Sequence, residues 1–340
     1  MEKLLINGGG SLSGTISCSG AKNAALPMIA ATILSGESII LKNLPYLQDI
    51  TTMFELLGSM GAEILLNENM DFTITSNNLK EKEARYELVK TMRASILVLG
   101  PLVAKYGSAK IALPGGCAIG SRPVNFHLDA LEQLGASIAL RNGYIEASAD
   151  RLVGAKIKFD GVTVTGTENI MMAACLAEGI TTLSNVAKEP EIIDLADLLN
   201  NMGAKITGAG TDEITIEGVK NLHGTEFSIP ADRIEAGTYL VAAVVTGGEI
   251  TINGINPERL NKVIDKLKET GAEIITTKNS ISLLMNRQKP KPVDITTAPF
   301  PEFPTDMQAQ FSVINAISDG VSNIYETVFE NRFMHVQELN

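Results

Sequence analysis

The chain has 340 residues, of which 45% are hydrophobic, 20% are charged and 5% are aromatic, with no tryptophan. This composition is typical of a globular protein, and the length predicts two domains. The formal net charge of -11 excludes a broad basic surface, so we expect neither nucleic acid nor an anionic membrane as a partner.

The start of the chain lacks the basic and apolar regions of a signal peptide, and no run of about 18 apolar residues occurs anywhere. We therefore expect a cytoplasmic protein with no membrane partner. Cys18, Cys117 and Cys175 lack paired spacing, so we expect neither disulfides nor a zinc site. The three histidines lack the spacing of metal ligands as well, and no metal site is predicted.

A short phrase in which glycine precedes alanine recurs along the chain, with its glycines at positions 61, 135, 203 and 271. The intervals of 74, 68 and 68 residues indicate an internal repeat. Each glycine is expected to end an amphipathic helix, such as 194–201 or 259–270, just before a strand begins.

Each repeat also contains an earlier helix that is apolar almost all round, which predicts that this helix is buried. These helices are expected at residues 24–34, 94–103, 170–177, 237–245 and 307–317. Short β-branched strands are expected between the two helices of a repeat, at residues 38–41, 109–112, 181–184 and 249–252. We therefore predict α/β modules with their apolar helices inside and their sheets outside.

The repeat spacing also leads to an expectation about the fifth copy, whose marker glycine is due at 339–345. That copy would be cut in its outer helix, and a unit of a repeat protein rarely buries its apolar face alone. We expect the chain to be a truncated product, a gene fragment or one half of a split protein.

The loop at residues 113–123 places Cys117 among three glycines, with Arg122 five residues later. Glycine lets the backbone approach a small ligand closely, and a nearby guanidinium lowers the pKa of a thiol from about 8.5. The loop therefore indicates a reactive cysteine. The alternative interpretation is a hairpin with an incidental, packing cysteine.

Charged side chains stand at the starts of the predicted buried helices, where free N–H groups and the helix dipole favour anions. Lys22 and Arg93, together with Arg122, predict a site for a phosphate or a carboxylate. Asp306 in such a cationic setting would accept a proton from a hydroxyl group. The alternatives are solvated charges at Lys22 and Arg93, and a helix-capping acid at Asp306. His127 could contact a substrate phosphate.

Five segments resemble the UDP-N-acetylglucosamine 1-carboxyvinyltransferase family of enolpyruvyl transferases. They are residues 19–27, 90–95, 113–123, 303–310 and 326–335. The resemblance implies the enolpyruvyl transferase fold, a two-domain inside-out α/β barrel of repeated βαβαββ units with three units in each domain. The implied domains are 22–229 and 1–21 plus 230–340, the second incomplete because the last unit is missing.

The resemblance also implies the reaction, which is transfer of the enolpyruvyl group of phosphoenolpyruvate to the 3-hydroxyl of UDP-N-acetylglucosamine with release of phosphate. This is the first committed step of peptidoglycan synthesis, and no metal or organic cofactor is implied. Cys117 would protonate the methylene carbon and be alkylated by the epoxide fosfomycin, and Asp306 would be the base on the hydroxyl. Closure of the Cys117 loop would exclude water.

The resemblance assigns the binding residues as well. Phosphoenolpyruvate and its phosphate would be held by Lys22, Arg93 and Arg122, and the sugar and the intermediate by Asn23 and Arg332. The residues that would line the nucleotide-sugar site are Arg122, Pro123, Val124, Asn125, Phe126, Val162, Thr163, Val164, Thr165 and Val328.

Three features depart from the family pattern. Asn125-Phe126 and Thr165-Gly166 differ from the usual residues near the uracil and the diphosphate, and an Asp-Leu-Arg segment and a further arginine of the last family unit have no counterpart. Two other functions stay open. One is a catalytically silent remnant that binds UDP-N-acetylglucosamine. The other is a transferase like 5-enolpyruvylshikimate 3-phosphate synthase, which the cysteine loop and residues 331–335 disfavour.

Overall fold

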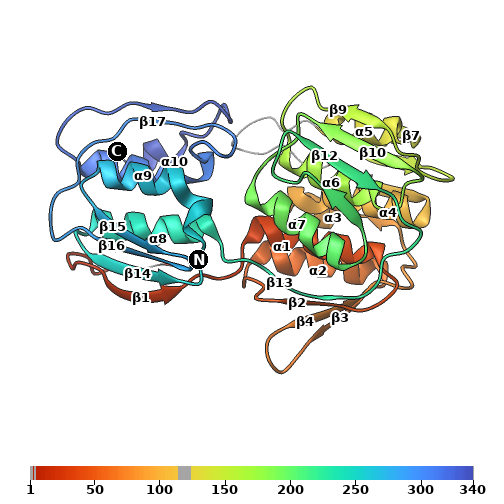
Figure 1. The fold of residues 1–340 in the computed structure, drawn as a ribbon, viewed down its shortest axis with the longest axis horizontal. Coiled ribbons are helices and arrows are strands. Elements are labelled where there is room, and N and C mark those ends of the chain that lie inside the picture. Colours follow the sequence, from red (N-terminus) through yellow and green to blue (C-terminus); the bar gives the residue numbers. More distant parts are fainter. Residues whose placement is uncertain (1–2, 4, 114–123, 340) are drawn as a thin grey trace. The chain divides into compact units, whose positions relative to one another are not determined.

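The computed structural model describes residues 3, 5–113 and 124–339 (Figure 1). The chain divides into two compact units, Gly20–Pro230 and Met1–Ser19 with Ala231–Asn340. We call the first the nested unit and the second the flanking unit. The flanking unit is assembled from both ends of the chain, because β1 (Ser13–Ser17) pairs in parallel with β14 (Glu249–Asn253).

The nested unit contains three four-stranded sheets of one design. In each sheet two strands pair in parallel, and the second of them also pairs with an antiparallel hairpin. The first sheet has the order β13 (Glu226–Ser228), β2 (Ile39–Lys42), β4 (Phe72–Thr75), β3 (Glu63–Leu66). The second has the order β5 (Glu83–Ala84), β6 (Ser108–Ala112), β8 (Tyr144–Ser148), β7 (Ser137–Arg141). The third has the order β9 (Lys156–Lys158), β10 (Ile180–Ser184), β12 (Glu213–Glu217), β11 (Lys205–Thr207).

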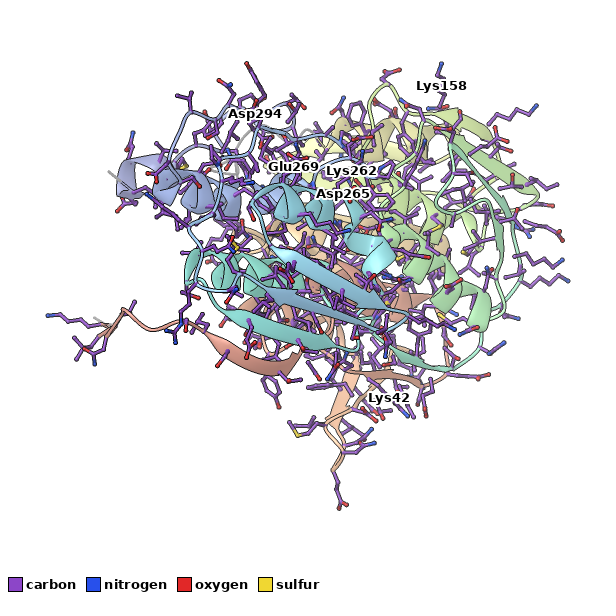
Figure 2. All side chains as sticks on the ribbon, turned by 60° about the vertical axis from the view of Figure 1, so that its left-hand side comes forward. Lys42, Lys158, Lys262, Asp265, Glu269 and Asp294 are labelled. Carbon is purple, nitrogen blue, oxygen red and sulfur yellow. The ribbon has the colours of Figure 1, made fainter. Side chains whose placement is uncertain are left out.

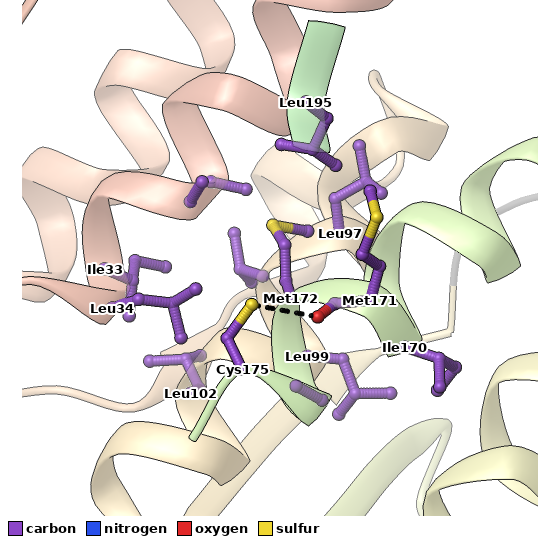
Figure 3. Close-up of a cluster of buried hydrophobic side chains, with 14 of the residues drawn as sticks. Ile33, Leu34, Leu97, Leu99, Leu102, Ile170, Met171, Met172, Cys175 and Leu195 are labelled. Carbon is purple, nitrogen blue, oxygen red and sulfur yellow. Dashed lines mark hydrogen bonds between the residues drawn. The ribbon is translucent and has the colours of Figure 1, made fainter. Parts of the chain in front are cut away.

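The helices of the nested unit bury its apolar core. They are α1 (Lys22–Ala31) with the 3-10 turn η1 (Thr32–Leu34), α2 (Gln48–Met60), α3 (Tyr86–Val89), the 3-10 helix η2 (Arg93–Val98), α4 (Leu99–Tyr106), α5 (Asn125–Gln133), α6 (Val164–Ala174) and α7 (Pro190–Asn201). Figure 1 shows α1, α6 and α7 between the first and third sheets. Figure 3 shows side chains of η1, α6 and α7 converging with those of η2 and α4. There the Cys175 thiol donates a hydrogen bond to the carbonyl of Met171. The predicted arrangement of apolar helices inside the sheets is confirmed for this unit.

The flanking unit contains one sheet of the same design, in the order β1, β14, β16 (Ser280–Leu284), β15 (Glu273–Thr277). Its helices are α8 (Arg233–Val245), the 3-10 turn η3 (Pro257–Leu260) and α9 (Asn261–Glu269). On α9, Val263, Ile264 and Leu267 are buried. Lys262, Asp265 and Glu269 are exposed on the opposite face (Figure 2). This is the amphipathic outer helix that the sequence predicts.

The rest of the flanking unit holds a second, smaller sheet, in which β17 (Ile295–Thr296) pairs in parallel with β18 (Ile324–Tyr325). Between them lie the 3-10 turn η4 (Thr305–Met307) and α10 (Gln308–Ile317), and α11 (His335–Leu339) follows. Phe311 of α10 is fully buried and packs edge to face on Phe303, with ring centroids 5.0 Å apart.

The four marker glycines adopt the left-handed conformation that lets a helix end. Gly61, Gly135, Gly203 and Gly271 have φ angles of 106°, 95°, 98° and 98°. Each lies directly after the last residues of an outer helix, so the role predicted from the repeat is confirmed.

One predicted helix start is wrong by six residues, because α6 begins at Val164 rather than at residue 170. Thr163 caps the helix, since its side chain accepts a hydrogen bond from the backbone N–H of Gly166. The polar run Thr167-Glu168-Asn169 therefore lies within the buried helix instead of ahead of it.

Across the described ranges, none of the helices combines the length and the apolar character that crossing a membrane requires.

Candidate functional site

The candidate residues are divided between the two units. Asp306, Val328 and Arg332 belong to the flanking unit, and the remaining described candidates belong to the nested unit. Cys117, Arg122 and Pro123 lie outside the described residues.

In the flanking unit, Asp306 lies in the first turn of η4, which leads directly into α10. Its carboxylate accepts a hydrogen bond from the guanidinium of Arg332 at 2.7 Å, and the two side chains are 38% and 18% exposed. The Arg332 guanidinium also lies over the ring of Phe329. The structure thus brings together two predicted site residues that are 26 positions apart in the sequence, and the carboxylate stays partly exposed.

Glu326 organises the backbone around this pair. One carboxylate oxygen, Oε1, accepts from the Thr297 hydroxyl at 2.9 Å and from the backbone N–H groups of Val328 and Phe329. The other, Oε2, accepts from the hydroxyl of Thr305, next to Asp306, at 2.8 Å. One side chain therefore fixes both the turn that carries Asp306 and the loop that carries Val328. Glu326 lies in the segment 326–335 that resembles the family, and no local pattern in the sequence predicts this role for it.

In the nested unit, Lys22 and Asn23 are the first two residues of α1. The Lys22 ammonium lies 3.2 Å from Asp49 of α2 and its side chain is 42% exposed, so it is paired and still reachable by solvent. Arg93 is the first residue of η2. Both cations thus stand at helix starts, as predicted from the repeat.

Two segments assigned to the nucleotide sugar meet in the nested unit. The ring of Phe126 lies against Gly161, so closely that a Cβ on that glycine would approach the ring to 3.2 Å. The imidazole Nε2 of His127 lies 3.3 Å from the hydroxyl of Thr165. The two segments are therefore in contact through the buried His127, and Asn125 and Val162 are exposed on them.

His127 itself is buried, and its other ring nitrogen, Nδ1, lies 2.9 Å from the side-chain nitrogen of Asn169. Burial, followed by the positive charge of Arg93, lowers the pKa of His127 from 6.5 to about 4. The ring is therefore neutral at pH 7. The effect of Arg93 also shows that this predicted anion-binding cation lies near the segment that carries His127.

Comparison with known proteins identifies the family. The family model of EPSP synthase (3-phosphoshikimate 1-carboxyvinyltransferase) matches residues 6–340. The UDP-N-acetylglucosamine 1-carboxyvinyltransferase of Hydrogenovibrio crunogenus is 56% identical over 339 residues, and that of Ruthia magnifica subsp. Calyptogena magnifica is 57% identical over 340 residues. Each match covers 100% of this chain and 81% of the relative. The chain belongs to the UDP-N-acetylglucosamine 1-carboxyvinyltransferase family of enolpyruvyl transferases.

Solved structures confirm the predicted fold class. The enolpyruvyl transferase NikO from Streptomyces tendae superposes with a TM-score of 0.86 at 23% identity, covering 98% of this chain and 79% of NikO. EPSP synthase from Acinetobacter baumannii gives a TM-score of 0.72 at 17% identity, covering 97% and 78%. The chain has the enolpyruvyl transferase fold.

The two described cysteines of this enolpyruvyl transferase chain are unsuited to chemistry. Cys18 and Cys175 are buried, and desolvation raises the pKa of each thiol to about 12. A thiol in this state is a packing group rather than an acid or a nucleophile at neutral pH.

Glu168 of α6 is a buried acid. Desolvation, followed by the charges of Glu191 and Glu189, raises its pKa well above 4.5. Its Oε1 atom has no hydrogen-bond partner among the described residues.

Among residues 3, 5–113 and 124–339, no group of three or more His, Cys, Asp or Glu side chains is placed to hold a metal ion.

Proposed function

We propose that this chain transfers the enolpyruvyl group of phosphoenolpyruvate to the 3-hydroxyl of UDP-N-acetylglucosamine and releases phosphate, the first committed step of peptidoglycan synthesis. The observation that carries the proposal is 56 to 57% identity along the whole chain to relatives named for this activity. The nested and flanking units would be the two domains between which the candidate residues are shared.

Addition of the sugar hydroxyl to phosphoenolpyruvate needs two proton transfers. The methylene carbon gains a proton while the hydroxyl oxygen loses one and attacks the neighbouring carbon, which gives a tetrahedral intermediate. In our assignment Cys117 donates the first proton and Asp306 accepts the second. The Asp306–Arg332 ion pair supports this role, because it holds the carboxylate in a defined position with part of its surface open.

Collapse of the intermediate then expels phosphate and removes a proton from the former methylene carbon. The leaving group and the carboxylate of the substrate are anions, which cations at helix starts stabilise. We assign this role to Lys22 and Arg93 in the nested unit and to Arg122. Arg332 and Asn23 would hold the sugar and the intermediate.

The acceptor sugar distinguishes this proposal from its enzymatic rival. EPSP synthase from Acinetobacter baumannii shares the fold at only 17% identity, far below the relatives named for UDP-N-acetylglucosamine. We therefore expect shikimate 3-phosphate to be a poor acceptor. We assign residues 124–127 and 162–165 of the nested unit, and Val328 of the flanking unit, to recognition of the nucleotide sugar.

The test measures phosphate release by the chain with both substrates, and UDP-N-acetylglucosamine binding by calorimetry. Asp306→Asn and Cys117→Ala should each lower kcat by about 100-fold or more, since a positioned acid or base contributes about 10² to 10⁴. Asp319→Asn and Cys18→Ala are matched controls outside the proposed site and should retain the rate. Binding without phosphate release by the wild-type chain would favour the silent remnant, and faster turnover with shikimate 3-phosphate would favour the rival enzyme.

A further inference from the structure

Asn169 is a fully buried polar residue of α6 whose side chain connects three helical segments. Its Oδ1 accepts a hydrogen bond from the backbone N–H of Gly100, at the start of α4, at 2.6 Å. Its Nδ2 donates to the carbonyl of Ile96 in η2 at 2.9 Å and lies 2.9 Å from Nδ1 of His127 in α5. A Cβ on Gly100 would approach Oδ1 of Asn169 to 2.4 Å, so only glycine fits there.

The backbone partners fix the orientation of this amide. A backbone N–H can only donate and a carbonyl can only accept, so oxygen must face Gly100 and nitrogen must face Ile96. The side-chain nitrogen therefore also faces His127, and Nδ1 of the imidazole must be the acceptor. In the neutral ring the proton then resides on Nε2.

The consequence reaches Thr165 in the first turn of α6. The protonated Nε2 lies 3.3 Å from the Thr165 hydroxyl oxygen and donates to it. Because that oxygen is already an acceptor from His127, its own hydrogen is directed elsewhere. Thr165 is half-buried, in the segment that begins with the exposed Val162. Thr165 is also one of the residues at which the sequence departs from the family pattern.

We propose that His127 and Asn169 are positioning residues, which hold the Thr165 hydroxyl as a donor to an anionic oxygen of the bound nucleotide sugar. The inference rests on the proposed function, and the ligand oxygen belongs to the diphosphate. Asn169 acts through His127, and His127 acts through Thr165. The network also ties the helix that begins at Arg93 to the segment that receives the nucleotide.

A double-mutant cycle tests the chain of contacts. Calorimetry measures the Kd of UDP-N-acetylglucosamine, in the absence of phosphoenolpyruvate, for the wild-type chain, Thr165→Val, His127→Phe and the double variant. We expect each single change to weaken binding about tenfold, as loss of a hydrogen bond to a charged group does. The double variant should bind no more weakly than Thr165→Val alone, because His127 acts only through that hydroxyl.

Two further variants separate positioning from folding. His127→Gln can restore a donor toward Thr165 and should recover most of the affinity, and His223→Phe is a matched control that should leave Kd unchanged. In turnover assays Thr165→Val and His127→Phe should raise KM for the nucleotide sugar with kcat unaltered. An additive cycle, with binding about a hundredfold weaker in the double variant, would overturn the inference.

Nitrogen NMR of the histidine rings gives a readout that needs no ligand. The chain has three histidines, so loss of one ring signal in His127→Gln assigns the resonance. We expect Nε2 to be protonated and Nδ1 to be bare at pH 7, and a proton on Nδ1 would overturn the inference. A wild-type chain that binds no UDP-N-acetylglucosamine would instead defeat the proposed function, and with it the ligand named here.

Discussion

The nested and flanking units share one sheet design, a parallel pair of strands extended by an antiparallel hairpin. They differ in how many four-stranded sheets of this design they contain. Within the described residues, the nested unit has three four-stranded sheets, whereas the flanking unit has one four-stranded sheet and one of two strands. In the complete sheets β2, β6, β10 and β14 each pair with an antiparallel strand on the side away from their parallel partner. Strand β18 occupies the corresponding place beside β17 without such a partner among the described residues.

This difference shows that neighbouring repeats bury one another's apolar side chains. In the nested unit, most residues of α1, α4 and α6 are buried, and α6 packs against both α1 and α4. Near β18 and α11, large apolar side chains are open instead, with Val321 90%, Tyr325 60% and Met334 58% exposed. The apolar helices of this fold are therefore buried where successive copies cover one another.

Hydrogen exchange should reveal the largest contrast between the units. We expect amides of α1, α4 and α6 to exchange about a thousandfold more slowly than amides of β18 and α11, because local opening requires little free energy where few apolar groups are buried. Mass spectrometry of peptic peptides measures both in one experiment. Equal protection at β18 and α6 would show that the smaller sheet is as stable as the complete ones.

Truncation of one core side chain in each unit tests whether the units unfold separately. Phe311→Ala removes a fully buried ring from the flanking unit and should cost about 3 to 5 kcal/mol. Met172→Ala, in the nested core of Figure 3, should cost about 2 to 5 kcal/mol. Calorimetric scans should show each variant shifting a different transition. A shift of both transitions by either variant would indicate a single cooperative unit.

The pH dependence of stability should distinguish the nested unit as well. The pKa of His127 is about 4 in the folded chain and 6.5 as the ordinary value, so the unfolded chain binds the proton more tightly. Stability should therefore fall as the pH drops from about 6.5 to about 4, by about 3 kcal/mol. His127→Gln should remove this part of the slope in urea titrations of the nested transition. An unchanged slope in that variant would exclude His127 as its cause.

The smallest expected effect concerns the ion pair of Lys22 and Asp49 in the nested unit. The side chains are 42% and 35% exposed, so water screens the attraction. Asp49→Asn should change the free energy of unfolding by less than about 1 kcal/mol. Urea denaturation of the variant beside the wild-type chain measures this. A loss of several kcal/mol would show that the pair is an essential part of the nested core.

Local sequence signals predicted much of the fold. The glycine spacing identified the repeat, and the apolar helices and β-branched strands fell close to their observed positions because these signals lie within each element. The start of α6 was missed because capping by Thr163 let a helix begin with polar residues. The helix then buried Asn169 against partners about seventy residues earlier in the chain, at Ile96 and Gly100.

The candidate site was harder to predict from the sequence than the fold. Spacing indicated cations at helix starts and a reactive loop, whereas the assignment of individual residues came from the family resemblance. The Asp306–Arg332 pair and the four hydrogen bonds to Glu326 depend on how loops return to one another, which no local pattern encodes. The roles of Cys117, Arg122 and the other proposed substrate residues remain predictions.

The pairing of β1 with β14 has a consequence for synthesis on the ribosome. Residues 13–17 emerge early, yet their partner strand, at residues 249–253, is made more than two hundred residues later. The nested unit, whose 211 residues are 20–230, can fold first, because all strands of its three sheets lie within those residues. Strand β1 therefore stays unpaired until β14 has been synthesised, by which time the nested unit can already have folded.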